Sequence, residues 1–204
     1  MEFHRILGAT LAHRTQGVDV AEHVGQRHHG VDDLRIAALT RAGDLATADG
    51  YFVTGGAKSV VANRISHAFD FHGPSLMTDT ACSSSLVVLD MARHALERGE
   101  IDTAIVGASN LLLDPRTFVG FAQATMLSPT GRSRPFSAQA DGFMRAEGAG
   151  ILLLEEYEAA KARGAKIYAE VAGAAQTCDA HHVTAPDPEG RGVALAMSLA
   201  LADA

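Results

Sequence analysis

The chain has 204 residues, of which 47% are hydrophobic and 20% charged, a composition typical of a compact, soluble α/β protein. A formal net charge of −7 disfavours nucleic acid or an anionic membrane as a partner, and no apolar run approaches the ~18 residues of a spanning helix. The N-terminus lacks a signal-peptide pattern, and the two cysteines, Cys82 and Cys178, indicate reduced thiols, so we expect a cytoplasmic protein.

Residues 1–50 are the least informative part of the chain. Scattered apolar positions between charged ones over residues 18–39 predict one or two exposed helices, interrupted near Gly30. The adjacent pair His28 and His29 resembles a metal site only superficially, because neighbouring histidines point in different directions. A solvated surface pair is the favoured interpretation.

The middle of the chain alternates helical and extended patterns. Apolar spacing predicts a helix over residues 57–69 and another over 83–97, which stops at Gly99. Short apolar runs predict strands at 75–78 and 103–107, so residues 75–107 are expected to form a β-α-β unit. Downstream, the patterns predict loops with a short helix over 111–140, a strand at 150–155, a helix at 157–163, a strand at 167–172 and a helix at 190–201.

The most informative residue is Cys82, on the predicted turn between a strand and a helix. A thiol at a helix N-terminus lies among unpaired N–H groups and the positive end of the helix dipole, and both favour the thiolate. The same N–H groups can stabilise an oxyanion on an attacked thioester carbonyl. The alternative is a small buried hydrophobe, the usual environment of a cysteine that forms no disulfide. A Cys82–Cys178 disulfide would be incompatible with a nucleophilic role.

The residues around Cys82 carry a family resemblance. The stretch 80–85 reads Thr-Ala-Cys-Ser-Ser-Ser, and further motifs occur in order: Asn-Arg-Ile-Ser at 63–66, Gly-Pro-Ser at 73–75, Val-Gly-Ala-Ser-Asn at 106–110, Met-Leu-Ser-Pro at 126–129, Gly-Arg-Ser-Arg-Pro-Phe at 131–136, Asp-Gly-Phe at 141–143 and Glu-Gly-Ala-Gly at 147–150. From about Tyr51 to the C-terminus the chain therefore resembles the β-ketoacyl synthases, the condensing enzymes of fatty-acid and polyketide assembly.

The resemblance implies an α/β, thiolase-like fold of layered αβαβα architecture, with mostly the first half present. Residues 1–50 then form a divergent or truncated N-terminal segment. Residues 51–165 form the N-terminal half with the nucleophile turn, and residues 166–204 begin the second half. The resemblance also implies a homodimer or a larger synthase, because relatives pair across a two-fold axis near this turn.

The implied reaction transfers an acyl group from an acyl carrier protein to Cys82. A malonyl-type extender, also carried on phosphopantetheine, then loses CO2 and attacks the acyl-cysteine in a decarboxylative Claisen condensation. No cofactor or metal is implied. Relatives also use two histidines, one in His-Gly-Thr, and a Gly-Phe-Gly loop, and neither motif occurs here. The chain alone is thus expected to be incompetent for condensation, and a non-catalytic fragment or partner subunit of a larger synthase is the alternative.

The resemblance assigns substrate contacts to four further residues: Thr117 and Phe121 to the acyl pocket, and His182 and Thr184 to the substrate channel. Phe121 could equally be a core residue. Zinc coordination by residues 178–182 is disfavoured, because ligands spaced so closely on one loop do not form a tetrahedral cage.

Two charged features of the sequence, Glu147 and a group of three arginines, also call for an interpretation. Glu147 is expected to have a structural hydrogen-bond role. The arginines Arg132, Arg134 and Arg145 are interpreted as a basic cluster, either solvated or facing an acidic carrier protein. The motifs mix polyketide and fatty-acid signatures, so the pathway stays open.

Overall fold

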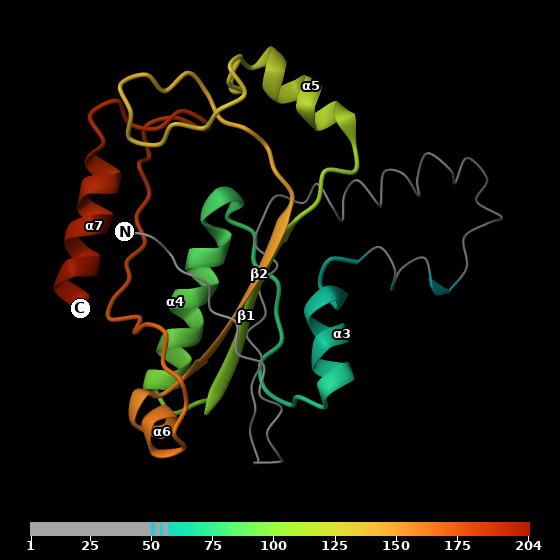
Figure 1. Ribbon diagram of the computed structural model, residues 1–204, viewed down its shortest axis with the longest axis vertical. Helices are drawn as coiled ribbons and strands as arrows, with labels where there is room; N and C mark the ends of the chain where they lie inside the picture. The colour runs from blue at the N-terminus through green and yellow to red at the C-terminus, as the bar shows by residue number, and fades with distance from the viewer. Residues whose placement is uncertain (1–49, 52–53, 55–56) are drawn as a thin grey trace.

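The computed structural model describes residues 50–51, 54 and 57–204, and the expectations for residues 18–39 and the pair His28–His29 lie outside them (Figure 1). The elements are α3 (Val60–Phe69), the short 3₁₀ helix η2 (Ala81–Ser83), α4 (Ser84–Glu97), β1 (Thr103–Asn110), α5 (Pro115–Gln123), β2 (Gly148–Glu155), α6 (Tyr157–Ala162) and α7 (Arg191–Asp203). None of the helices in this described part is long and apolar enough to cross a membrane.

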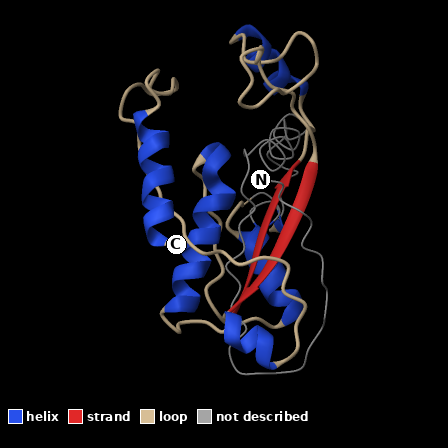
Figure 2. Ribbon diagram, turned by 60° about the vertical axis from the view of Figure 1, so that its left-hand side comes forward, coloured by secondary structure: helices blue, strands red, loops and turns tan. Residues whose placement is uncertain are grey.

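A two-stranded antiparallel sheet forms the centre of the described part. Strand β1 pairs with β2 from Thr103↔Glu155 to Asn110↔Gly148. Helix α4 lies between this sheet and α7 in both views (Figures 1 and 2). The core forms where α4 meets β1, around Val88, Ala92, Ile101, Ala104 and Val106. The apolar run predicted strand β1 correctly, and Ala104 and Val106 are buried where β1 meets α4. The expected cover on both faces is not seen in the described residues, because Ile151 and Leu153 of the paired strand β2 are exposed.

All the predicted helices of the described part are present, within a few residues of their predicted bounds, and so are the strands that became β1 and β2. The predicted strands at 75–78 and 167–172 are wrong, because both segments are irregular. The β-α-β unit expected over 75–107 is therefore absent from the described residues. A strand requires a neighbour to complete its backbone hydrogen bonds, and β1 and β2 pair with each other instead. The apolar pattern at 75–78 reflects packing, since Leu76 contacts the core.

Side-chain caps explain where α5 and α6 begin. The Asp114 carboxylate accepts a hydrogen bond from the backbone N of Arg116 at 2.8 Å, and Pro115 occupies the first turn of α5. Glu156 caps α6 by accepting from the backbone N of Glu158 and Ala159. These contacts hold the helices that flank both ends of the sheet.

A buried charged cluster attaches α7 to α4. The Arg93 guanidinium donates to Asp90 at 3.1 Å and to Asp203 at 2.7 Å, and Gln176 donates to the other Asp90 oxygen at 2.9 Å. Burial raises the pKa of Asp90, but the hydrogen bonds from Gln176 and Arg93 and the nearby positive charges outweigh burial and lower it. The cluster thus holds α7 beside α4, the helix that follows Cys82.

Large apolar side chains are exposed on several elements, β2 and α7 among them. On β2, Ile151 is 56% and Leu153 39% exposed, although a central strand would bury them. Helix α7 exposes Val193, Leu195, Met197, Leu199 and Leu201. Exposed apolar side chains in this number are typical of surfaces that another polypeptide covers.

Candidate active site around Cys82

Cys82 lies in η2, directly ahead of α4, and its side chain is exposed. Its neighbour Ala81 has a φ of 55°, in the left-handed region that residues other than glycine rarely adopt. Such conformations persist where the surroundings hold them, and they concentrate at functional sites. The exposed thiol excludes the alternative of a small buried hydrophobe. Cys178 is also an exposed thiol, so the chain has no Cys82–Cys178 disulfide.

Side chains on both sides of the turn hold its backbone. The Asp79 carboxylate accepts from the backbone N of Ala81 at 3.0 Å. The Ser84 hydroxyl accepts from the backbone N of Thr80 at 2.7 Å and donates to the carbonyl of Ala81 at 2.8 Å. The Ser83 hydroxyl donates to the carbonyl of Thr80 at 2.8 Å. Four backbone groups immediately before the cysteine thus have side-chain partners.

The start of α4 gives a developing anion a favourable electrostatic environment. The helix has 14 residues, its N-cap Ser83 makes no side-chain capping bond, and its first turn holds no acidic residue. The helix dipole is positive at this end, although the first N–H of α4, that of Ser84, already donates to the carbonyl of Ala81. An oxyanion formed on a carbonyl attacked by Cys82 would therefore lie in a favourable field.

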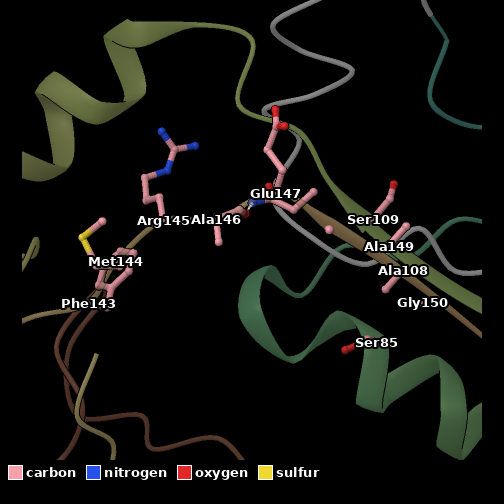
Figure 3. Close-up of a pocket in the computed structure, with 12 residues that line it drawn as sticks. Ser85, Ala108, Ser109, Phe143, Met144, Arg145, Ala146, Glu147, Ala149 and Gly150 are labelled. Carbon is pink, nitrogen blue, oxygen red and sulfur yellow. Dashed lines mark hydrogen bonds between the residues drawn. The ribbon is translucent and has the colours of Figure 1, made fainter. Parts of the chain in front are cut away.

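A hollow of about 450 Å³ opens between the start of α4 and the ends of the two strands (Figure 3). Its lining includes Ser85, three residues after Cys82, with residues 108–110 of β1 and residues 143–150 leading into β2. Asn110 ties the strand ends together by donating to the carbonyl of Ala146 at 2.5 Å. The Glu147 carboxylate accepts from the backbone N of Leu112 at 2.8 Å, in agreement with its expected structural role.

An aromatic cluster with a buried cation borders this hollow. The Arg145 guanidinium carbon lies 4.5 Å from the ring centroid of Phe118 and 5.5 Å from that of Phe121. Phe121 also packs edge to face on Phe143, with 5.5 Å between the centroids. Arg145 is only 7% exposed, so its assignment to a surface basic cluster with Arg132 was wrong. Its burial depends on the fold of α5 over the strand ends, which the motif itself does not reveal.

The four other predicted substrate-contact residues differ in whether they contact the lining of the hollow. Phe121 is in van der Waals range of Phe143, which lines the hollow, and Thr117 is half-buried one helical turn earlier in α5. His182 and Thr184 lie on an exposed loop, where His182 Nδ1 accepts from the backbone N of Thr184 at 3.2 Å. The structure thus brings Phe121 to the border of the hollow and leaves His182 and Thr184 outside its lining.

The zinc alternative at residues 178–182 gains no support. Across the residues that the structure describes, no three histidine, cysteine, aspartate or glutamate side chains converge as a metal site would require. Asp179 instead accepts from the backbone N of Asp187 at 3.0 Å, which closes the loop ahead of α7.

The loop that leads to the hollow packs tightly at Gly142. The Asp141 carboxylate accepts from Ser128 at 2.7 Å and Thr130 at 2.9 Å, and these bonds with the charge of Arg134 lower the pKa of Asp141. At Gly142 the backbone φ is 129°, and a Cβ there would lie 2.5 Å from the backbone N of Ser128. The Asp-Gly-Phe motif therefore requires glycine at this position.

We expect Gly142→Ala to lower the free energy of unfolding by about 3 kcal/mol or more, through backbone overlap and strain at positive φ. Urea unfolding followed by circular dichroism measures the change. Gly120→Ala is the matched control, because a Cβ at this α5 position meets no atom within 4 Å and alanine favours a helix. Equal stability of the two variants would contradict the close packing at Gly142.

Comparison with known proteins identifies the family. Residues 2–160 match the sequence model described as the β-ketoacyl synthase, N-terminal domain. The chain belongs to this family. Among its relatives, polyketide synthase ThaG of Burkholderia thailandensis is 46% identical over 145 residues, which cover 70% of this chain and 3% of ThaG. The 3-oxoacyl-[acyl-carrier-protein] synthase 2 of Synechocystis sp. is 45% identical over 136 residues, or 64% of this chain and 33% of that protein.

Solved ketosynthase structures share the fold. The oxazolomycin ketosynthase domain OzmH KS7 of Streptomyces albus superimposes with a TM-score of 0.73 at 33% identity, covering 91% of this chain and 32% of that one. The ketosynthase from module 6 of the bacillaene synthase of Bacillus subtilis gives a TM-score of 0.66 at 32% identity, with 84% and 28% covered. These matches confirm the predicted α/β, thiolase-like ketosynthase fold. This β-ketoacyl synthase chain spans about a third or less of the relatives it matches.

Proposed function

We propose that the chain carries the acyl-accepting part of a β-ketoacyl-[acyl carrier protein] synthase, with Cys82 as the nucleophile. The observation that carries this proposal is the exposed Cys82 thiol on a braced turn directly ahead of α4. Cys82 is not itself in the lining of the hollow, which α4 reaches through Ser85. An exposed thiol with nearby N–H donors is the arrangement that thioester exchange requires. Family membership supports an acyl carrier protein as the carrier of the thioester.

In the first half-reaction, Cys82 Sγ attacks the carbonyl carbon of the acyl-carrier thioester. The carbonyl oxygen becomes an oxyanion, which the N–H of Cys82 and the start of α4 stabilise. Collapse of this intermediate breaks the bond to the carrier sulfur, which leaves as a thiolate and takes up the proton that Cys82 lost. The products are an acyl-cysteine and a carrier with a thiol.

In the second half-reaction, a malonyl-type extender loses CO2 and its carbanion attacks the acyl-cysteine carbonyl. The bond to Cys82 Sγ breaks, the thiolate is regenerated, and the β-ketoacyl product remains on the carrier. No cofactor is needed for this balance. Relatives perform the step in polyketide and fatty-acid synthesis, and we propose the reaction that both pathways share.

We further propose that Thr117 and Phe121 contact the acyl chain, because α5 borders the hollow through Phe143. His182 and Thr184 are proposed to contact substrate farther along its channel, on the resemblance alone. The two loop residues are exposed, which leaves them accessible to a bound carrier arm.

Further polypeptide is proposed to complete this site. The exposed apolar residues of β2 and α7 fit a face covered by the remainder of a synthase, or by a second copy in a homodimer. The catalytic histidines that relatives use would come from that polypeptide, in a cytoplasmic setting where both thiols stay reduced. A purely non-catalytic partner subunit is the alternative, and the presence of Cys82 favours the catalytic reading.

The proposal predicts that cerulenin or iodoacetamide labels Cys82 at least tenfold faster than Cys178, about the gain expected from a favourable helix terminus. Both thiols are exposed, so exposure alone would give similar rates. Peptide mapping by mass spectrometry measures the two rates in the same molecule. Equal rates, or a protected Cys82 in the folded chain, would refute the nucleophile.

A further inference from the structure

We propose that Ser84 is a positioning residue for Cys82, and this inference rests on the proposed function. Ser84 is the first residue of α4 and is 1% exposed, so its hydroxyl neither reacts with substrate nor contacts solvent. Its role must therefore act through the residues it bonds. Those residues are Thr80 and Ala81, which directly precede the nucleophile.

The Ser84 hydroxyl uses its donor and an acceptor site on this short segment. It accepts from the backbone N of Thr80 at 2.7 Å and donates to the carbonyl of Ala81 at 2.8 Å. The buried Ser84 oxygen thus connects the N–H of Thr80 with the carbonyl of Ala81, which belongs to the peptide bond between Ala81 and Cys82. Removal of the hydroxyl would leave the Thr80 N–H to find a new partner, and it would take one donor from the Ala81 carbonyl, which keeps the backbone N–H of Ser84.

The conformation of Ala81 explains why this brace matters. A φ of 55° is unfavourable for alanine, and the conformations that alanine favours have negative φ. Asp79 holds its N–H at 3.0 Å and Ser84 holds its carbonyl. The backbone N–H of Ser84 also donates to this carbonyl, and the two side chains add the contacts that hold Ala81 in its unfavourable conformation. Loss of either side-chain contact would let Ala81 relax to an ordinary conformation, and this rotation would redirect the Cys82 side chain that follows it.

The neighbouring serine does not duplicate this role. Ser83 is exposed, and its hydroxyl donates to the carbonyl of Thr80, outside the Ala81–Cys82 peptide. The Ser84 side chain joins the left-handed residue to the first turn of α4. The geometry therefore separates Ser84 from the other serines of the motif.

The test compares the rates of Cys82 acylation by hexanoyl-N-acetylcysteamine in the wild-type chain, Ser84→Ala and Ser84→Thr. We expect Ser84→Ala to slow acylation by about tenfold or more, since small misplacements of reacting groups cost up to about 10²-fold. Ser84→Thr keeps the hydroxyl and should retain most of the rate. Ser198→Ala is the matched control, because it removes an exposed hydroxyl bonded within α7.

Alkylation of Cys178 in the same samples separates positioning from unfolding. General unfolding would leave Cys178 as reactive as in the wild-type chain and would give Cys82 the rate of an unstructured thiol. Circular dichroism would report this loss of structure. Should Ser84→Ala fail to fold, exposed Asp79 gives a second pair: Asp79→Ala removes the acceptor for Ala81 and should slow acylation, whereas Asp79→Asn keeps an acceptor and should not.

The outcomes are distinguishable. A wild-type chain that does not acylate Cys82 would refute the proposed function itself. A wild-type chain that acylates, with folded Ser84→Ala at the same rate, would refute only the positioning role. A folded Ser84→Ala that is slow at Cys82, unchanged at Cys178 and rescued by threonine supports it.

Discussion

Cys82→Ala is expected to abolish acyl-enzyme formation, and Cys178→Ala is expected to leave it unchanged. No other side chain in the turn can take over, because hydroxyls such as that of Ser83 are far weaker nucleophiles without an activating base. Incubation with an acyl thioester followed by intact-protein mass spectrometry measures the adduct. Loss of the signal should be complete within detection.

The Cys82→Ala variant should keep its fold, which makes the loss interpretable. The hydrogen bonds that brace the turn run between Asp79, Thr80, Ser83 and Ser84 and the backbone, and none of them uses the Cys82 sulfur. Substitution of an exposed side chain typically changes stability by less than about 0.5 kcal/mol. Equal thermal midpoints for the two cysteine variants provide the check, and an acyl adduct that survives in Cys82→Ala would disprove the assignment.

Sequence patterns predicted the helices, and they predicted the two strands that have a neighbouring strand to pair with. The helix that became α4 has regular apolar spacing and ends before Gly99, where φ is 65°. Strand β1 was predicted from its continuous apolar run, and it pairs with β2 only some forty residues later. The strands expected at 75–78 and 167–172 failed for the opposite reason. Their apolar residues signal burial, but periodicity carries no information on whether a neighbouring strand is present.

The candidate site also has parts that the sequence predicts and parts that it does not. Cys82 could be found from sequence, because the motif places a thiol between a turn and a helix, and the described structure has it exposed there. The burial of Arg145 over Phe118 could not, since it depends on how α5 folds across the strand ends. The brace by Ser84 was equally hidden. Nothing in a run of serines tells which hydroxyl turns inward until the backbone at Ala81 is known.

These 204 residues alone are expected to form no measurable β-ketoacyl product from acyl- and malonyl-carrier protein, although they acylate Cys82 slowly. Loss of one oxyanion donor costs about 10²–10³ in rate for acyl transfer, and this sequence lacks the Gly-Phe-Gly loop that supplies the second donor in relatives. It also lacks the His-Gly-Thr motif, so the imidazoles that serve decarboxylation would be missing as well. Acylation needs neither group in principle, because the start of α4 lies beside the thiol.

The measurement follows acyl-Cys82 and the β-ketoacyl carrier product by mass spectrometry in one reaction. The control is a chain extended through a His-Gly-Thr segment from a relative, which should form both species. Size-exclusion chromatography should also show self-association of the shorter chain, since Ile151 and Leu195 are more than half exposed within broad apolar faces. Steady product formation by a monodisperse 204-residue chain would contradict the prediction. Replacement imidazoles would then have to be present, and His181→Ala and His182→Ala would identify them by loss of product with acylation preserved.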